Sequence, residues 1–488
     1  MSRPSSGIEP ALTQVQPGIV ATRECIFPIA AGNALPPSPK PPRFQERGYV
    51  RALQFFQEQT APKFSAYFPD DLWVSWIPRL AYADDGIGHA LISMASYHEL
   101  FSRAVEPASS FNSMAKRKLT ILALSQYNSA ISSISDIAPQ TMLGTEFRHL
   151  VSCVVFLAIE MLRGQIACAI NLLTYGKQLL EILDKQEALL LIDQVLILKL
   201  VRALFARLTY QAVWLVGDKA PGHCFSQCYD RSLRWPDDGH LKFKDFHQAR
   251  EYFFFISLNR ASIPIHETVK RFSIWCDELD TFSTSWKSAT GEHQSARDGS
   301  YQALQLYRAH FQIEIKAQMQ AQHDDSIVWD QYGFDYNQII DLVTQVQPVI
   351  HNRSSAAHFQ MAISTVPILW YVITRCRIPR IRQRALSALE SRTVQEGLIK
   401  SDYIAAIARR VIDVEQREHN VTSCVEVPFR ARVAQSSSAD ASTTRSFACF
   451  DFLADWASTP AKLYANLEAS GSHGDDILPS YYDHTTLG

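Results

Sequence analysis

The sequence predicts an all-α protein, built as a large irregular stack of helices. Apolar residues recur at spacings of three and four through most of the chain, the periodicity of helices with one buried face. Glycine is scarce, with 19 glycines in 488 residues, and the strict apolar–polar alternation of a half-buried strand is rare. Together these observations favour stacked helices over a fold based on a sheet.

The helical periodicity is clearest in two stretches of the first half of the chain. One runs from Lys118 to Ile134, and the other begins at Ile166. Each carries an apolar residue every few positions, which places those side chains on one face. The predicted faces are Leu119, Leu122, Tyr127, Ile131 and Ile134 for the first helix, and Ile166, Ile170, Leu173, Leu180 and Leu183 for the second.

Two further stretches are more apolar than a surface helix needs to be. Arg148 to Leu162 is apolar nearly all round, which predicts a helix packed on several sides. Leu189 to Val216 is similarly apolar, and we expect one long amphipathic helix or two shorter ones, because charged residues break any run long enough to cross a bilayer. These charged residues are Asp193, Lys199, Arg202 and Arg207.

The second half of the chain contains three more predicted helices and one predicted strand. Ser354 to Thr374 has no charged residue and is long enough to span a membrane, but Pro367 and several polar residues favour a buried helix, or a helix pair broken at the proline. Val421 to Val433 is the best candidate for a strand. The three helices are Ala303–Ala321, Tyr336–Ile350 and Tyr403–Gln416.

The composition changes at both ends of the chain and predicts three regions. Residues 1–46 are proline-rich, which favours an extended, disordered leader. Residues 47–420 carry the helical periodicity and are predicted to form one body. Residues 421–488 are rich in serine and threonine and then acidic and aromatic, so we expect a disordered tail.

Charge and cysteine usage indicate an intracellular globular protein. The formal net charge is −2, so no overall basic field draws the chain to DNA or to anionic lipid. Nine scattered cysteines favour reduced thiols of the cytosol or nucleus over a disulfide framework. The first twenty residues lack the basic and apolar regions of a signal peptide.

A search for catalytic and metal-binding motifs predicts no catalytic residue, no cofactor and no metal. The chain has no phosphate-binding GxxxxGK[ST] loop, no GxSxG elbow and no HExxH pair. Gly86-Ile87-Gly88 is half of a dinucleotide fingerprint, and a tight turn before a helix from His89 explains it better. His223, Cys224 and Cys228 form a compact cluster, but a zinc site needs about four ligands.

A group of five arginines is the one local basic candidate for contact with nucleic acid. On a helix they could contact phosphates, but they can equally pair with carboxylates of neighbouring helices, and no aromatic residues alternate with them to stack on bases. We therefore expect no specific DNA binding by this chain alone. The five are Arg375, Arg377, Arg380, Arg382 and Arg384.

The C-terminal tail has the composition of a partner-binding segment. From residue 434 to 488 it holds seven acidic residues against Arg445 and Lys462, a net charge of −5. Acidic residues keep nearby aromatic side chains solvated and available to a groove on a partner. We predict Phe450, Phe452 and Trp456 as the anchors of an activation segment; the alternative is a terminal helix docked on the body.

Three segments of the chain carry motifs whose order and spacing are informative together. The first segment is Ala52–Phe56, Trp73 and Gly88–Ser93. The second is Gln126–Ile131, Cys153, Phe156, Glu160 and Arg163-Gly164. The third is Pro367–Trp370, Cys376-Arg377, Arg384-Ala385, Glu396-Gly397 and Ile412–Glu415. In this order and spacing they resemble the fungus-specific transcription factor regulatory region of zinc binuclear cluster regulators.

The resemblance spans residues 47 to 417 and implies a helical regulatory body in the nucleus. It implies transcription machinery or other regulators as partners, with a possible homo-oligomer and no membrane association. The family's zinc cluster needs six closely spaced cysteines, whereas residues 1–152 contain only Cys25, so neither that metal site nor its DNA contacts transfer here. The alternatives are an enzyme with a site in a helical pocket and a non-nuclear helical scaffold.

One ion pair is predicted inside the family-like segments. Glu160 ends an apolar helix, and Arg163 follows it by about one turn. Charges so close to a core are usually paired. We therefore predict that Glu160 and Arg163 bind each other and have a structural role.

Overall fold

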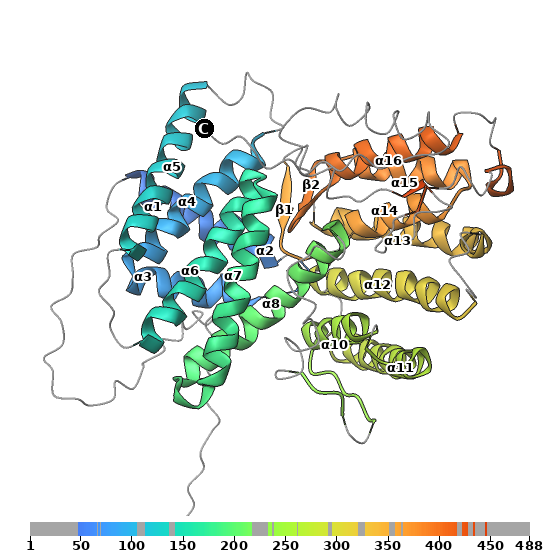
Figure 1. Ribbon diagram of the computed structural model, residues 1–488, viewed down its shortest axis with the longest axis horizontal. Coiled ribbons are helices and arrows are strands. Elements are labelled where there is room, and N and C mark those ends of the chain that lie inside the picture. Colours follow the sequence, from blue (N-terminus) through green and yellow to red (C-terminus); the bar gives the residue numbers. More distant parts are fainter. Residues whose placement is uncertain are drawn as a thin grey trace, which may run out of the picture. The chain divides into compact units, whose positions relative to one another are not determined.

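The computed structural model confirms the all-α fold (Figure 1). The chain divides into a unit Met1–Gln45 and a compact unit Glu46–Gly488. The structure describes residues 47–446 with internal gaps, and Phe450, Phe452 and Trp456 lie outside the described residues. The gaps are residues 66, 69, 105–112, 136–141, 217–232, 237–238, 261, 291–294, 321–326, 351–356, 363–364, 417–421, 428–432 and 435–444.

The first part of the compact unit is organised around helix α4, which packs against α1, α3, α5 and α6 (Figure 1). Two π-helical turns, η1 and η2, interrupt the helices that precede it. The elements are α1 (Arg47–Phe55), η1 (Phe56–Thr60), α2 (Ala61–Ser65), η2 (Leu72–Trp76), α3 (Ile77–Ala83), α4 (Asp85–Ser102), α5 (Ser113–Ser135), α6 (Met142–Arg163), α7 (Ile166–Lys185), η3 (Glu187–Leu189) and α8 (Ile192–Val216).

Helix α4 begins four residues before the predicted start at His89, so the interpretation of Gly86-Ile87-Gly88 as a turn was wrong. The side chain of Asp84 caps the helix by accepting a hydrogen bond from the backbone N–H of Ile87 at 3.0 Å. An N-cap of this kind satisfies a donor of the first turn. A Cβ at Gly86 would lie 2.8 Å from the Ile134 side chain, so glycine lets α4 and α5 approach closely.

The buried face of α5 differs from the predicted one. Leu119 is buried as expected, but Ile131 is 44% exposed. The reason is its partner α4, whose small side chains allow a close approach, so that small residues of α5 occupy the contact and larger ones flank it. The Ser93 hydroxyl, for example, donates to the carbonyl of Ala123 at 2.9 Å. The buried face is Leu119, Ala123, Gln126 and Ala130.

The predictions for the next three helices are confirmed. Helix α6 is buried on all sides over most of 148–162, and α7 buries four of its five predicted apolar residues. Helix α8 is one long helix. Among the described helices, α7 alone is apolar and long enough to cross a membrane, but it packs against α6 and α8, and core helices outside membranes pass the same test.

The second part of the compact unit is again helical. An aromatic core joins α10, α11 and α12, in which the Phe253 ring stacks on Tyr307 and packs on Trp275. The three predicted helices of this half are present. The elements are α10 (Phe246–Asn259), α11 (Ile265–Thr290), α12 (Ser295–Gln320), η5 (Val328–Tyr332), α13 (Gly333–Ile350), α14 (Val366–Arg375), α15 (Pro379–Glu390), α16 (Ser401–Gln416) and η6 (Cys424–Glu426).

A small sheet lies among these helices. Strand β1 (His358–Gln360) pairs in parallel with β2 (Val394–Glu396), which pairs antiparallel with β3 (Ile399–Lys400). The β2–β3 turn has Gly397 at φ +58°, a conformation that glycine adopts without strain. A second pair, β4 (Val433–Ala434) and β5 (Arg445–Ser446), is parallel.

Two predictions near this sheet were wrong. The described residues of 354–374 are neither one helix nor a helix pair broken at Pro367, because they contain β1. Pro367 lies in the first turn of α14, where its missing N–H is tolerated. The predicted strand Val421–Val433 contains the short 3-10 helix η6 instead, and among the described residues of this stretch Val433 alone is in a strand.

Candidate functional site

The predicted pair Glu160–Arg163 is present at the end of α6. The Arg163 guanidinium donates to Glu160 Oε1 at 2.8 Å, and the Tyr127 hydroxyl donates to the same oxygen at 2.8 Å. The Glu160 residue is only 2% exposed. The Arg163 guanidinium also lies over the rings of Tyr97 and Tyr127, 5.7 and 5.2 Å from their centroids, a favourable cation–π geometry. Two parts of the second family-like segment therefore contact each other.

Replacing Glu160 by alanine is expected to lower the free energy of unfolding by about 2 kcal/mol, because the Arg163 cation and the half-buried Tyr127 hydroxyl lose their shared acceptor. Chemical denaturation of the purified full chain measures this loss. Glu181→Ala on the exposed side of α7 is the control. A Glu160→Ala variant as stable as the wild type would contradict the structural role.

The carboxylate of Glu396 holds the start of α14. It accepts hydrogen bonds from the backbone N–H of Thr365 at 2.9 Å, from the Thr365 hydroxyl at 3.0 Å and from the Gln360 amide at 3.2 Å. Glu396 is fully buried. A negative charge at a helix N-terminus compensates the unpaired N–H groups and the helix dipole. The Glu396-Gly397 part of the third family-like segment thus contacts the helix that contains Pro367.

The arginines of the predicted basic group are mostly engaged inside the protein. Arg377 and Arg382 both bind the buried carboxylate of Glu415, the former with 3.5 Å between Nε and Oε1. Arg384 pairs with Asp341 at 2.8 Å. Arg375 lies over the Trp329 ring, 4.6 Å from its centroid. Arg380 is the exposed member of the group, so carboxylate pairing explains these residues better than a phosphate-binding surface does.

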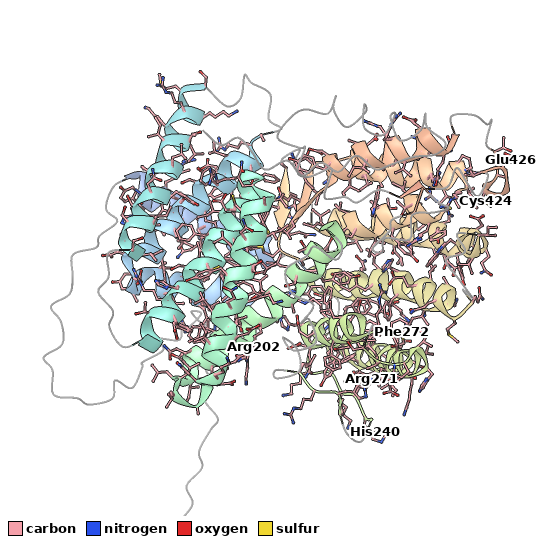
Figure 2. The ribbon with its side chains drawn as sticks, in the orientation of Figure 1. Arg202, His240, Arg271, Phe272, Cys424 and Glu426 are labelled. Carbon is pink, nitrogen blue, oxygen red and sulfur yellow. The ribbon has the colours of Figure 1, made fainter. Side chains whose placement is uncertain are left out.

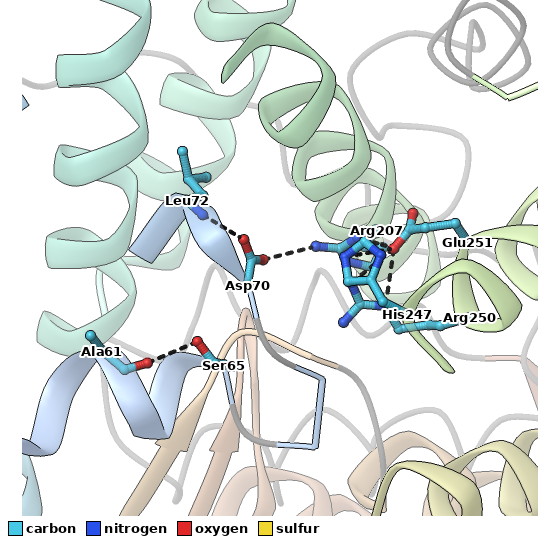
Figure 3. A network of polar contacts seen from close by, with 8 residues as sticks. All are labelled: Ala61, Ser65, Asp70, Leu72, Arg207, His247, Arg250 and Glu251. Atoms are coloured by element: carbon cyan, nitrogen blue, oxygen red, sulfur yellow. Dashed lines mark hydrogen bonds and ion pairs between the residues drawn. The ribbon is translucent and has the colours of Figure 1, made fainter. Parts of the chain in front are cut away.

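A buried charged network, which we call the Arg207 network, connects three elements that are distant in the sequence (Figure 3). Arg207 of α8 contacts Glu251 of α10 at 2.6 Å and Asp70, just before η2, at 3.6 Å. Arg250 lies 2.8 Å from Glu251, and His247 lies 3.9 Å from it. The Arg250 guanidinium also covers the Phe68 ring, 4.6 Å from its centroid.

The charges of the Arg207 network compensate one another. Two arginine cations face two carboxylates, and the arginine side chains are 3% and 2% exposed. Asp70 also accepts a hydrogen bond from the backbone N–H of Leu72 at 3.0 Å. Groups that are buried and mutually paired in this way hold elements together, and they present no free acid or base to a substrate. We therefore assign the network a structural role.

A second charged residue of α8, Arg202, which is labelled in Figure 2, has a similar role. Arg202 donates from Nε to Asp184 at 3.0 Å and lies 3.2 Å from Glu187. Its side chain is 2% exposed. These contacts tie the middle of α8 to the end of α7 and to η3. The two arginines that interrupt the apolar stretch of α8, Arg202 and Arg207, therefore help to orient the helix.

The Arg207 network predicts a specific loss of stability in acid. Burial raises the pKa of Glu251, but the cations of Arg207 and Arg250 outweigh this effect and lower the pKa to about 2. Because the unfolded-state pKa lies near 4.5, the stabilisation is complete above that pH and is lost as the pH falls towards 2. The expected loss is about 3 kcal/mol, measured by urea unfolding between pH 2 and pH 6.

The matched variant for this measurement is Glu251→Gln, which removes the titrating group and keeps its shape. It should be less stable than the wild type at pH 6, and the difference between the two should shrink as the pH falls below 4.5. A difference that stays constant over this range would contradict the assigned role of the Glu251 charge.

The remaining predicted site residues do not enter the described structure. Cys25, Cys224 and Cys228 lie outside it, as do the three predicted anchors of the tail. Within the residues that the structure places, no three His, Cys, Asp or Glu side chains gather as metal ligands would. Comparison of the chain with family models, with curated proteins and with solved structures gave no match.

Proposed function

We propose that this chain is a transcriptional regulator or co-regulator of a fungal gene set, acting in the nucleus through its helical body. The proposal rests on the family resemblance and on one structural observation: residues that the resemblance groups into motifs contact one another. Tyr127 contacts Glu160, and Arg377 contacts Glu415, in each case across more than thirty residues of sequence. Motif residues that jointly build a fold are expected to meet in this way.

The same observation supports a mode of action through partners. Several charged motif residues, such as Glu160, Arg377 and Glu415, are buried, so they hold the helices in place and leave the recognition of partner proteins to other surfaces. The proposed partners are transcription machinery or other regulators, with a second copy of the chain as a further candidate. Specific DNA recognition requires an element that reads base edges and phosphate contacts that position it; in this proposal a partner supplies both.

Imaging of the tagged full chain together with transcript profiling of a deletion strain tests the proposal. The expected result is nuclear accumulation and altered expression of a defined gene set, restored by the wild-type chain. Purified chain should show no sequence preference in a titration with promoter fragments of those genes. Exclusion from the nucleus with an unchanged transcript profile would reject the regulator and favour a scaffold or an enzyme.

The tail is expected to carry a separable activating function. Fusion of residues 434–488 to an unrelated DNA-binding domain should activate a reporter, because Phe452 and Trp456 would share a helical face on a partner and dominate binding. Their replacement by alanine should reduce the signal at least severalfold, whereas alanine at Ser436–Ser438 should not. A silent fusion, in a host that responds to other acidic activators, would place the regulatory output in the helical body.

A further inference from the structure

A partly open pocket of about 110 Å³ lies where the ends of α4 and α6 and the start of α7 meet β2, β3 and α16. Its lining combines two kinds of side chain. Phe101, Leu162 and Ile166 form an apolar wall, and Arg163, Lys400 and Tyr403 supply polar groups. The lining residues come from three parts of the chain that are far apart in sequence, near residues 101, 162–166 and 395–403, so a ligand here would contact all three.

The polar side of the pocket favours an anion. Arg163 and Lys400 each pair with one carboxylate, Glu160 at 2.8 Å and Asp402 at 3.2 Å. A guanidinium has five N–H donors and an ammonium has three, so one carboxylate does not use the donor capacity of either group. None of the described residues that line the pocket is acidic. The carboxylates of Glu160 and Asp402 are already bound to Arg163 and Lys400, so a bound anion would use the N–H donors that these two carboxylates leave over.

Two further features shape the polar end. Gly164 follows α6 with φ +75°, and the backbone N–H of Gln165 donates to the Glu160 carbonyl at 2.9 Å, the bond of a glycine-terminated helix end. A Cβ at Gly164 would lie 3.9 Å from the Tyr403 hydroxyl oxygen, so this turn borders Tyr403. Burial raises the pKa of Tyr403 to about 12, and its hydroxyl keeps its proton at neutral pH.

The apolar wall and the volume restrict the body of the ligand. Inorganic phosphate would leave Phe101, Leu162 and Ile166 without an apolar partner. Its binding would therefore lack the free energy that burial of apolar surface contributes. Pockets for drug-sized ligands measure roughly 300–1,000 Å³, well above the volume found here. The size therefore suits one ring or a short chain bearing a single carboxylate.

We propose that this pocket binds a small apolar monocarboxylate of about the size of benzoate. The carboxylate lies at Arg163, Lys400 and Tyr403, and the apolar body lies against Phe101, Leu162 and Ile166. Occupancy links the α6–α7 turn to β3 and α16, and it stabilises the folded chain in proportion to the logarithm of ligand concentration. The inference goes beyond the proposed function and does not depend on it.

Calorimetric titration of the purified full chain with sodium benzoate tests the proposal. Benzoate should bind saturably and raise the melting temperature, and neutral benzamide and inorganic phosphate should bind at least tenfold more weakly. Lys400→Met should weaken benzoate binding about tenfold, the effect of losing one charged hydrogen bond. Tyr403→Phe should weaken it by a smaller factor.

The matched control is Lys199→Met, an exposed lysine on α8, which should leave benzoate affinity unchanged. The melting temperature of each variant without ligand shows whether it is folded. Three outcomes would overturn the proposal: no benzoate binding at millimolar concentration, equal affinity for benzamide or phosphate, or unchanged affinity in a folded Lys400→Met chain. Because these are binding measurements, their failure leaves the nuclear role untouched.

Discussion

Replacing Glu415 by alanine is expected to lower the free energy of unfolding by about 3–5 kcal/mol, the loss typical of breaking a buried ion pair. The Glu415 side chain is fully buried, and the two arginine side chains that it binds, Arg377 and Arg382, are 2% and 1% exposed. Removing the carboxylate leaves both arginine cations buried without their counter-charge, in a region where water cannot take the place of the carboxylate. Arg382 also donates to the carbonyls of Ile373 and Cys376 at 2.9 and 2.6 Å, so it cannot easily turn towards solvent.

The matched control for Glu415→Ala is Glu390→Ala on the neighbouring helix α15. Glu390 accepts from Arg409 at 2.8 Å, but the side chains are 30% and 58% exposed. Exposed pairs contribute about 1 kcal/mol or less. Urea unfolding of both variants at neutral pH should therefore separate them by at least 2 kcal/mol. Similar losses in the two variants would show that burial of Glu415 does not control the stability of this end of the body.

The helices could be predicted from the sequence because their periodicity is local. Helix α6 is apolar on every side, and its burial followed from that pattern alone. The Glu160–Arg163 pair could be predicted because residues three apart on a helix are neighbours. The face of α5 was misjudged because the contact surface of a helix depends on its partner, and the small residues of α4 bring Ala123 and Ala130 into the contact instead of Ile131.

The Arg207 network could not be predicted in the same way. Arg207 was visible only as a charge that interrupts an apolar stretch, flanked by Phe205, Ala206 and Leu208. A cation flanked by core residues predicts a buried ion pair, because a buried cation needs a carboxylate partner. Which carboxylate it finds depends on how α8 packs against α10 and η2, and no local pattern contains that information. Strand β1 and the start of α14 could not be predicted for a related reason. Strand β1 pairs with β2, and the start of α14 is bound by Glu396, so both depend on residues that are distant in the sequence.

Replacing Arg207 by methionine is expected to lower the free energy of unfolding by about 3–5 kcal/mol at pH 7. Methionine keeps the apolar stem and removes the cation that lies between Asp70 and Glu251, whose side chains are 8% and 10% exposed. Arg250 remains near Glu251, but Asp70 loses the cation that lies 3.6 Å from it and keeps only its longer-range attraction to Arg250 and His247. The control is Arg308→Met. Arg308 pairs with Asp280, whose side chain is 51% exposed, so the expected loss in the free energy of unfolding is about 1 kcal/mol or less.

A double-mutant cycle separates the charge interaction from the packing of the arginine stem. If Arg207 stabilises the fold through Glu251, then Glu251→Gln should cost less in the Arg207→Met background than in the wild type, with a coupling of about 0.5–3 kcal/mol. The acid dependence gives an independent check. Without Arg207 the pKa of Glu251 should rise towards 4.5, because burial raises it and the cation that lowers it most is gone. The stability attributable to Glu251 between pH 6 and pH 2 should then shrink. Additive losses, together with an unchanged acid profile, would mean that the arginine stem and not its charge holds α8 against α10.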